Sequence, residues 1–199
     1  MIMGRHAKIN RQSITDSVVR LVAQSGPHSA TMRAISADMN VNEAALYRHY
    51  KSKDEILWSA YARIVEDMAL EKQHLAKANM PFRELLREWI RLTYVYFDAN
   101  PDAFAYVLLL PPPRDDKSAA ITQAQGKAFL SLIRRAIRNK EIAVIEPKLA
   151  FSHFSGIMLN VPRLIRDGVM RGPAIRYVDA VADAVWRILL PTGMHGLKI

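Results

Sequence analysis

Apolar residues recur at helical spacing along most of the chain, and no stretch alternates in the way that a half-buried strand would. In the first such stretch they fall at Ile14, Val18 and Val22, and Gly26 and Pro27 mark its end. The same spacing predicts further helices over residues 53–74, 82–99, 102–110, 118–139, 147–167 and 173–190. The pattern therefore predicts an all-α fold.

Residues 31–57 have a different layout, in which two short helices are joined by a tight turn. Thr31 and Asn42 each precede one of these helices, Ser52 precedes the helix that follows them, and all three are good capping residues. Asn40 falls at the turn, and asparagine is the residue other than glycine that best tolerates a left-handed backbone. One short helix braced by another is a compact way to place side chains in the major groove of DNA.

An aromatic and basic cluster closes this segment, in the run Leu46-Tyr47-Arg48-His49-Tyr50-Lys51-Ser52-Lys53. With this run the segment resembles the DNA-binding segment of the tetracycline-repressor (TetR) family of bacterial transcription regulators. Roughly residues 10–60 carry the specific resemblance, and beyond them only the length and the helical layout match. Further matching positions are Thr31, Arg33, Ile35, Ala37, Val41, Ala45, Ile56 and Leu57.

The resemblance implies a division of the chain into two domains. A three-helix helix-turn-helix DNA-binding domain is expected over residues 1–52. A helical ligand-binding and dimerisation domain is expected over residues 53–199, with a linking helix over residues 53–75.

The resemblance also implies contacts with double-stranded DNA. Arg33 would reach a base edge or a phosphate, and the methyl groups of Ala44 and Ala45 would lie near the groove floor, where they can touch a thymine methyl. Tyr47 and His49 would donate hydrogen bonds to phosphates. The full set of expected contact residues is Thr31, Arg33, Asn42, Glu43, Ala44, Ala45, Tyr47, Arg48, His49 and Lys53.

Glu43 has two interpretations. Its carboxylate can accept a hydrogen bond from a cytosine amino group. It can equally be a solvated acid in the first turn of a helix, where the helix dipole favours negative charge and where it would repel phosphate.

The later helices carry aromatic and methionine side chains of the kind that line an apolar cavity with few polar groups. The alternative is that these residues fill the core, and the resemblance favours a cavity for a small-molecule effector without identifying it. The candidate lining residues are Trp89, Thr93, Tyr96, Phe104, Phe129, His153, Phe154 and Met158.

An apolar seam in the last helix suits helix packing, with its residues at Val178, Ala182, Val185 and Leu189. The resemblance implies that the last two helices form a four-helix bundle across a two-fold axis, and the alternative is packing within one chain. A homodimer would present two recognition helices to a palindromic site, with half-sites about 34–36 Å apart or a multiple of that.

The composition narrows the chemistry. The chain has 28 basic and 19 acidic residues, and its formal net charge of +9 fits a polyanionic partner. The absence of cysteine excludes disulfides, zinc-thiolate sites and thiol catalysis. No glycine-rich phosphate loop or H-E-x-x-H motif is present and the six histidines are scattered, so neither catalysis nor a metal or cofactor is expected.

Residues 1–10 lack the apolar core of a secretory signal. No apolar run approaches the roughly 20 residues that span a bilayer. The sequence thus predicts a soluble, cytoplasmic protein without a membrane partner.

Two functions fit these features. The first is a ligand-responsive DNA-binding regulator, a repressor that a small apolar effector releases from its operator. The alternative is a non-specific nucleoid or interaction protein that uses the same fold.

Overall fold

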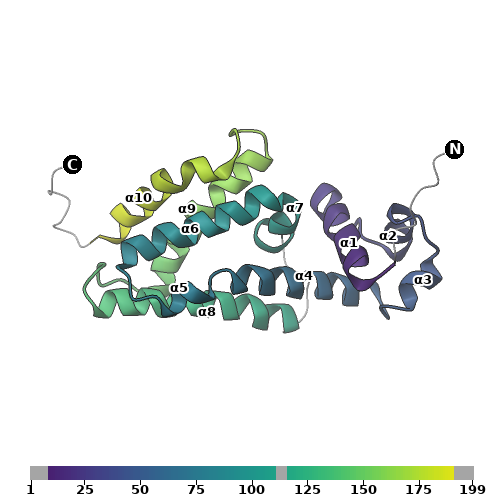
Figure 1. Cartoon of the computed structure of the whole chain (residues 1–199), viewed down its shortest axis with the longest axis horizontal. Helices are drawn as coiled ribbons and strands as arrows, with labels where there is room; N and C mark the ends of the chain where they lie inside the picture. Colours follow the sequence, from purple (N-terminus) through teal and green to yellow (C-terminus); the bar gives the residue numbers. More distant parts are fainter. Residues whose placement is uncertain (1–8, 111–115, 191–199) are drawn as a thin grey trace. The chain divides into compact units, whose positions relative to one another are not determined.

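The computed structural model describes residues 9–110 and 116–190, apart from the side chains of residue 76 and residues 116–125. Helices make up most of this part, and no strand occurs within it (Figure 1). The predicted all-α fold is confirmed. Residues 1–8, the main part of the segment judged to lack a secretory signal, lie outside the described residues.

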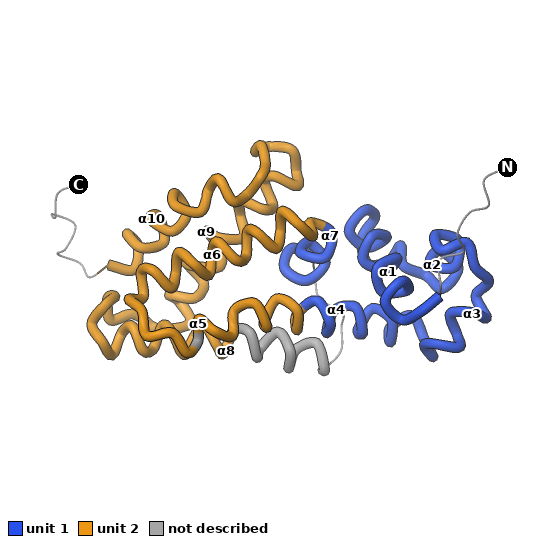
Figure 2. Tube along the Cα trace, viewed as in Figure 1, with its two compact units in different colours: residues 1–64, 102–118 blue, residues 65–101, 119–199 orange. Residues whose placement is uncertain are grey.

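The chain forms two compact units, coloured separately in Figure 2. Unit 1 comprises residues 1–64 and 102–118, and unit 2 comprises residues 65–101 and 119–199. Unit 1 is therefore formed by two separate stretches of the chain, the N-terminal residues 1–64 and residues 102–118.

Unit 1 opens with α1 (Arg11–Ser25), which is capped at both ends. The Asn10 side chain accepts a hydrogen bond from the Ser13 backbone N–H, and the Ser13 hydroxyl oxygen accepts one from the Asn10 N–H. Such a reciprocal capping box satisfies two of the free donors of a helix start. The helix ends at Gly26, whose φ of 82° favours glycine. The predicted end of this helix is confirmed.

The next two helices are short, and a tight turn joins them. They are α2 (Met32–Asp38) and α3 (Glu43–Tyr47). Asn40 in this turn has a φ of 53°, so the predicted left-handed conformation is confirmed. The Val41 N–H donates to the Ser36 carbonyl at 2.9 Å, which closes the turn.

The core of unit 1 joins these helices to the start of α4 (Lys53–Leu70) and to residues 102–110. α1 packs against α2 and against η1 (Ala105–Leu109), and α2 packs against α3. Within the unit, the Tyr106 hydroxyl donates to the Leu57 carbonyl at 2.7 Å. Burial, with a smaller effect of Tyr61, raises the pKa of Tyr106, so its hydroxyl remains a donor. The fully covered apolar side chains include Ile14, Val18, Val22, Ile35, Leu46, Ile56 and Ala60.

Two charged contacts fasten α1 to its neighbours. Asp38, at the end of α2, accepts from the Ser17 hydroxyl at 2.5 Å and from Arg20 at 2.7 Å. Partial burial acts to raise the pKa of Asp38, but these hydrogen bonds and the Arg20 charge hold it below its usual value. Arg63 of α4 pairs with Asp16 of α1 at 2.8 Å. The register of α1 against α2 and α4 is thus fixed by polar contacts as well as by packing.

Unit 2 is built around α6, α9 and α10. α6 packs against α10, against α9 and against the short 3₁₀ helix η2, and in Figure 1 α6 and α10 run side by side. Side chains distant in sequence cap its helix starts: the Glu141 carboxylate accepts from the Phe82 N–H, and the Asp98 carboxylate accepts from the N–H groups of Ala174 and Ile175. Its elements are α5 (Gln73–Lys77), α6 (Phe82–Ala99), α8 (Asp116–Arg138), α9 (Pro147–Arg166), η2 (Ala174–Tyr177) and α10 (Val178–Leu189).

Three predicted helices differ in detail. The helix expected over residues 53–74 ends at Leu70, and α5 follows as a separate helix, although no glycine or proline marks the break. The helix expected over residues 102–110 is α7 (Pro101–Phe104) followed by the π-helical η1. η1 ends at Leu109, because the next residue, Leu110, precedes a proline, and a residue before proline disfavours the α conformation. The helix expected over residues 173–190 begins as the 3₁₀ turn η2.

One lysine lies in the core of unit 2. Lys72 is 7% exposed, and its ammonium donates to the Met68 carbonyl at 3.3 Å and lies 5.7 Å from the centre of the Trp89 ring. Burial lowers the pKa of Lys72 to about 8, against a weaker opposing effect of Glu71. The charged form of this side chain therefore costs folding free energy.

We expect glycine to have opposite effects at Asn40 and Ala37. Asn40→Gly should leave the free energy of unfolding unchanged or raise it slightly, whereas Asn40→Ala should lower it by about 1 kcal/mol, because a Cβ is strained in the left-handed region. Ala37→Gly, in the helical backbone of α2, should lower it by up to about 1 kcal/mol. Urea denaturation followed by circular dichroism measures all three. A destabilising Asn40→Gly would show that the Asn40 side chain, and not its backbone, holds the turn.

Lys72→Met should stabilise the protein at pH 7. The folded pKa lies below the unfolded value, so the cost of the charge is complete below pH 8 and disappears as the pH rises towards the unfolded value of 10.5. At about 1.4 kcal/mol per pKa unit the gain is at most about 3–4 kcal/mol, and it should shrink by pH 10. Urea denaturation at both pH values measures it, with Lys77→Met, an exposed lysine of α5, as the neutral control. A Lys72→Met protein less stable than wild type at pH 7 would contradict this account.

Candidate functional site

The two sides of α3 differ sharply in exposure. Ala45 and Leu46 are buried, at 3% and 0% exposure, and hold the helix against α2. The opposite side exposes Glu43, Ala44 and Tyr47, and Arg48 follows at its end. The prediction that Ala45 lies near the groove floor is therefore wrong, because its methyl group is enclosed in the core of unit 1. Ala44 keeps the exposure that such a contact needs.

The two capping residues combine a structural contact with free donors. The Thr31 hydroxyl oxygen accepts from the Ala34 N–H at 3.1 Å, and the Asn42 amide oxygen accepts from the Ala45 N–H at 2.9 Å. Both side chains are exposed, and the caps use only their oxygen atoms. The Thr31 hydroxyl hydrogen and the Asn42 amide hydrogens remain available as donors. Arg33, two residues after Thr31, is exposed as well.

The segment after α3 is held by a residue that the sequence analysis did not single out. Arg11, at the start of α1, donates from Nη2 to the His49 carbonyl at 3.1 Å, and its guanidinium lies 4.9 Å from the centre of the Tyr50 ring. Tyr50 is buried, and its hydroxyl lies 3.2 Å from the Ser59 hydroxyl of α4. Arg11 had no sequence signal, because its partners lie 38 and 39 positions away.

His49 and Lys53 lie at the two ends of the connection between α3 and α4, and both side chains are half-buried. Lys53 is the first residue of α4, whose start is capped by Ser52: the Ser52 hydroxyl accepts from the Glu55 N–H at 3.2 Å. The predicted cap is confirmed. The exposed donors of α2 and α3 and these two side chains all belong to unit 1, and together they offer hydroxyl, amide and cationic groups suited to phosphates and base edges.

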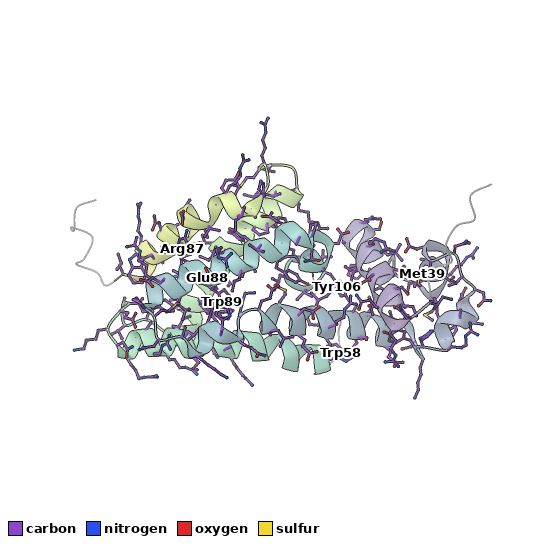
Figure 3. All side chains as sticks on the ribbon, viewed as in Figure 1. Met39, Trp58, Arg87, Glu88, Trp89 and Tyr106 are labelled. Atoms are coloured by element: carbon purple, nitrogen blue, oxygen red, sulfur yellow. The ribbon has the colours of Figure 1, made fainter. Side chains whose placement is uncertain are left out.

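Three of the eight predicted effector residues form one aromatic cluster in unit 2. Trp89, labelled in Figure 3, meets Phe129 edge-on with ring centres 4.8 Å apart, and Phe129 stacks on Phe154 at 4.0 Å. Phe151, from the same helix as Phe154, lies 6.0 Å from Phe129. Phe129 is therefore the centre of the cluster, and it links α6, α8 and α9.

The other predicted effector residues lie in different settings. Thr93 is buried and donates to the Trp89 carbonyl one turn back, while Tyr96 is buried in α6. The Met158 carbonyl accepts from the hydroxyl of Tyr94, which sequence analysis missed. His153 is half-buried, and its Nδ1 is covered without a hydrogen-bond partner in the described part of the chain.

Phe104 belongs to unit 1, whereas the other seven predicted effector residues belong to unit 2. Lys72, which contacts the Trp89 ring, was not among the predicted residues because a lysine between Glu71 and Gln73 has the pattern of a solvated surface.

The four residues predicted for the dimer interface are core residues of unit 2. Val178, Ala182, Val185 and Leu189 are at most 7% exposed in a single chain, where α10 packs against α6 and α9. Their spacing thus corresponds to the alternative of packing within one chain. The exposed residues of α10 include Ala180, Ala184 and Ile188, which follow one another at intervals of four.

Within the described residues, no group of three or more histidine, aspartate or glutamate side chains is placed to hold a metal ion. None of the helices in that part is long and apolar enough to cross a membrane.

Comparisons with known proteins agree with this geometry. Residues 14–59 match the model of bacterial regulatory proteins of the tetR family. A nucleoid occlusion factor, SlmA, from Marinobacter nauticus is 24% identical in an alignment 187 residues long, and the alignment covers 88% of this chain and 95% of the relative.

Two solved structures share the fold. A tetR family regulator from Marinobacter aquaeolei aligns with a TM-score of 0.76 and 15% identity over 90% of this chain and 94% of its own. The transcriptional regulator FadR from Bacillus subtilis, solved with stearoyl-CoA, aligns with a TM-score of 0.73 and 15% identity over 88% and 97%. The matched segment contains the capped α2–α3 pair of unit 1, so the chain carries the segment that marks the tetR family of bacterial regulatory proteins, and as a whole it has the fold of solved regulators of that family.

Proposed function

We propose that the protein is a ligand-responsive repressor that binds a palindromic operator as a homodimer and leaves it when a small effector binds unit 2. The observation that carries this proposal is the split of α3 into a buried side and an exposed side. Leu46 packs in the core on the buried side. The exposed side carries Ala44, Tyr47 and Arg48, whose side chains do not pack in the core.

On this proposal the exposed residues divide between phosphates and bases. Tyr47, His49 and Lys53 contact phosphates, which position the protein without reading sequence. Arg33 and Arg48 have the guanidinium geometry for bidentate contact with guanine, and Ala44 offers a methyl group to thymine. Thr31 and Asn42 add contacts with the DNA backbone, through the side-chain hydrogens that the helix caps leave free.

Glu43 retains both of its interpretations. It is exposed in the first turn of α3, where it either accepts from a cytosine amino group or is a solvated acid near phosphate.

The effector part of the proposal rests on unit 2. The FadR structure of the same fold was solved with stearoyl-CoA, and unit 2 has an aromatic cluster around Phe129 that would pack against an apolar ligand. An effector shifts the protein away from the operator only by as much as it binds the released conformation more tightly.

A second function, non-specific binding to the nucleoid, is favoured by one observation: the relative from Marinobacter nauticus is a nucleoid occlusion factor. It predicts equal affinity for all duplexes and a steep salt dependence, with log K falling by about 0.9 per phosphate contact for each tenfold rise in salt. Selection of bound fragments from random DNA at physiological salt separates the two functions, because a repressor enriches one palindrome and a non-specific binder enriches none.

Substitutions in unit 1 should separate phosphate contacts from base contacts. Tyr47→Ala and Lys53→Ala should weaken binding about equally for all operator variants, because phosphates are the same at every site. Arg33→Ala should cost roughly 1–3 kcal/mol and should also relax the preference at one base pair. Binding assays on a set of single-base operator variants measure both effects. Lys148→Ala, an exposed lysine of α9 in unit 2, is the control; if Arg33→Ala leaves the ranking of variants unchanged, Arg33 reads no base.

The exposed row of α10 should form the dimer contact. Its small residues Ala180 and Ala184 allow close approach of a partner helix, and Ile188 is 48% exposed. Ile188→Glu should place a charge in that contact and convert the dimer into a monomer at micromolar concentration, as measured by analytical ultracentrifugation. Val144→Glu, on a residue that is 94% exposed, should leave the dimer intact. An unchanged dimer in Ile188→Glu would exclude this face of α10.

A further inference from the structure

The ammonium group of Lys72 is enclosed in unit 2, and the described residues use only part of its hydrogen-bonding capacity. An ammonium has three N–H donors. One contact is the 3.3 Å hydrogen bond to the Met68 carbonyl, and another is the face of the Trp89 ring. No carboxylate of the described residues lies within ion-pair distance of this ammonium, and its sequence neighbour Glu71 is exposed.

This burial is unusual for lysine, which rarely lies fully inside a protein without a partner charge. A cation–π contact contributes about 0.5–2 kcal/mol and does not use the N–H donors, so it does not replace the water that burial removes. Residues that break the ordinary rules of burial are concentrated at functional sites.

The surroundings of the ammonium are apolar and aromatic. Trp89 lies between Lys72 and Phe129, and Phe129 stacks on Phe154. Lys72, which immediately precedes α5, and these three rings from α6, α8 and α9 all belong to unit 2. The arrangement places a single cation at the edge of an aromatic cluster, which is the pattern of an amphipathic ligand site: an apolar wall with few, well-placed polar groups.

The available charge points to a monoanion. On α6, Arg91 is already engaged by Glu88 through two hydrogen bonds of 2.6 and 2.7 Å, so its guanidinium is not free for a ligand. One lysine balances one negative charge, as a carboxylate has, and falls short of the nearly two charges of a phosphate monoester.

We propose that unit 2 binds an organic carboxylate, whose carboxylate group pairs with the Lys72 ammonium and whose apolar body packs against Trp89 and the rings around Phe129. This inference names the chemical class of the effector in the proposed function and rests on that function. Binding of the carboxylate would supply the acceptors that the buried ammonium lacks.

Matched pairs of probes test the assignment. Decanoate and naphthoate, each beside its neutral primary amide, are titrated into the full-length protein by calorimetry. Wild type should bind each carboxylate about 10- to 100-fold more tightly than its amide, because the amide oxygen can still accept from the ammonium but lacks the negative charge that pairs with it. Lys72→Met should reduce this ratio to about one, while Lys72→Arg should keep a preference for the carboxylate.

Two controls show that the effect is local. Lys77→Met removes an exposed lysine from α5 and should keep the full ratio. Thermal unfolding and circular dichroism establish that the Lys72→Met protein is folded. The assignment is overturned if wild type binds the carboxylates no better than the amides, or if Lys72→Met keeps the preference.

Measurements of ligand binding and of DNA binding on the same proteins separate the failure of this inference from the failure of the proposed function. A carboxylate preference that depends on Lys72, together with unselective DNA binding, would uphold the site and reject the repressor. Enrichment of one palindrome without any carboxylate preference would uphold the repressor and reject this ligand class. If the carboxylate binds through Lys72 and weakens operator binding in wild type, both are supported.

Discussion

Helix α3 has five residues, which is too few for a helix to be stable in water by itself. Its conformation and direction must therefore come from contacts with the rest of unit 1. The left-handed backbone at Asn40 turns the chain, the Asn42 cap starts the helix, and burial of Leu46 fixes which side faces inwards. Arg11 then fixes the chain that leaves the helix, through the His49 carbonyl and the Tyr50 ring. Every candidate DNA contact on α3 depends on these external supports.

The local part of this arrangement was predictable from the sequence, and the tertiary part was not. The caps at Thr31, Asn42 and Ser52 and the turn at Asn40 follow from rules that act within four residues, and the structure confirms each of them. Arg11 depends on partners that only the folded chain brings near. Asp38 likewise has its partners, Ser17 and Arg20, about twenty positions away.

Apolar spacing predicted the helices better than it predicted which neighbour each one faces. Leu189 and the other seam residues of α10 were predicted to face a partner chain, but they are buried within one chain, because periodicity does not distinguish a partner chain from α6 of the same chain. Ala45 shows the same ambiguity, because an alanine is small enough for either side of a helix. For Lys72 the charge of the side chain predicted exposure to solvent, whereas the residue is buried. Its burial depends on the turn between α4 and α5, which no glycine or proline marks in the sequence.

The separation of buried and exposed side chains on α3 has a consequence for how the sequence of such a protein evolves. Glu43, Ala44, Tyr47 and Arg48 make no contribution to the core, so replacing them alters the surface offered to a ligand and leaves the scaffold intact. Surface substitutions of this kind usually change stability by no more than about 0.5 kcal/mol. These four exposed positions are thus open to mutation and selection at almost no risk of unfolding. New binding preferences can arise there one residue at a time, while Leu46 and Asn40 preserve the framework that displays them.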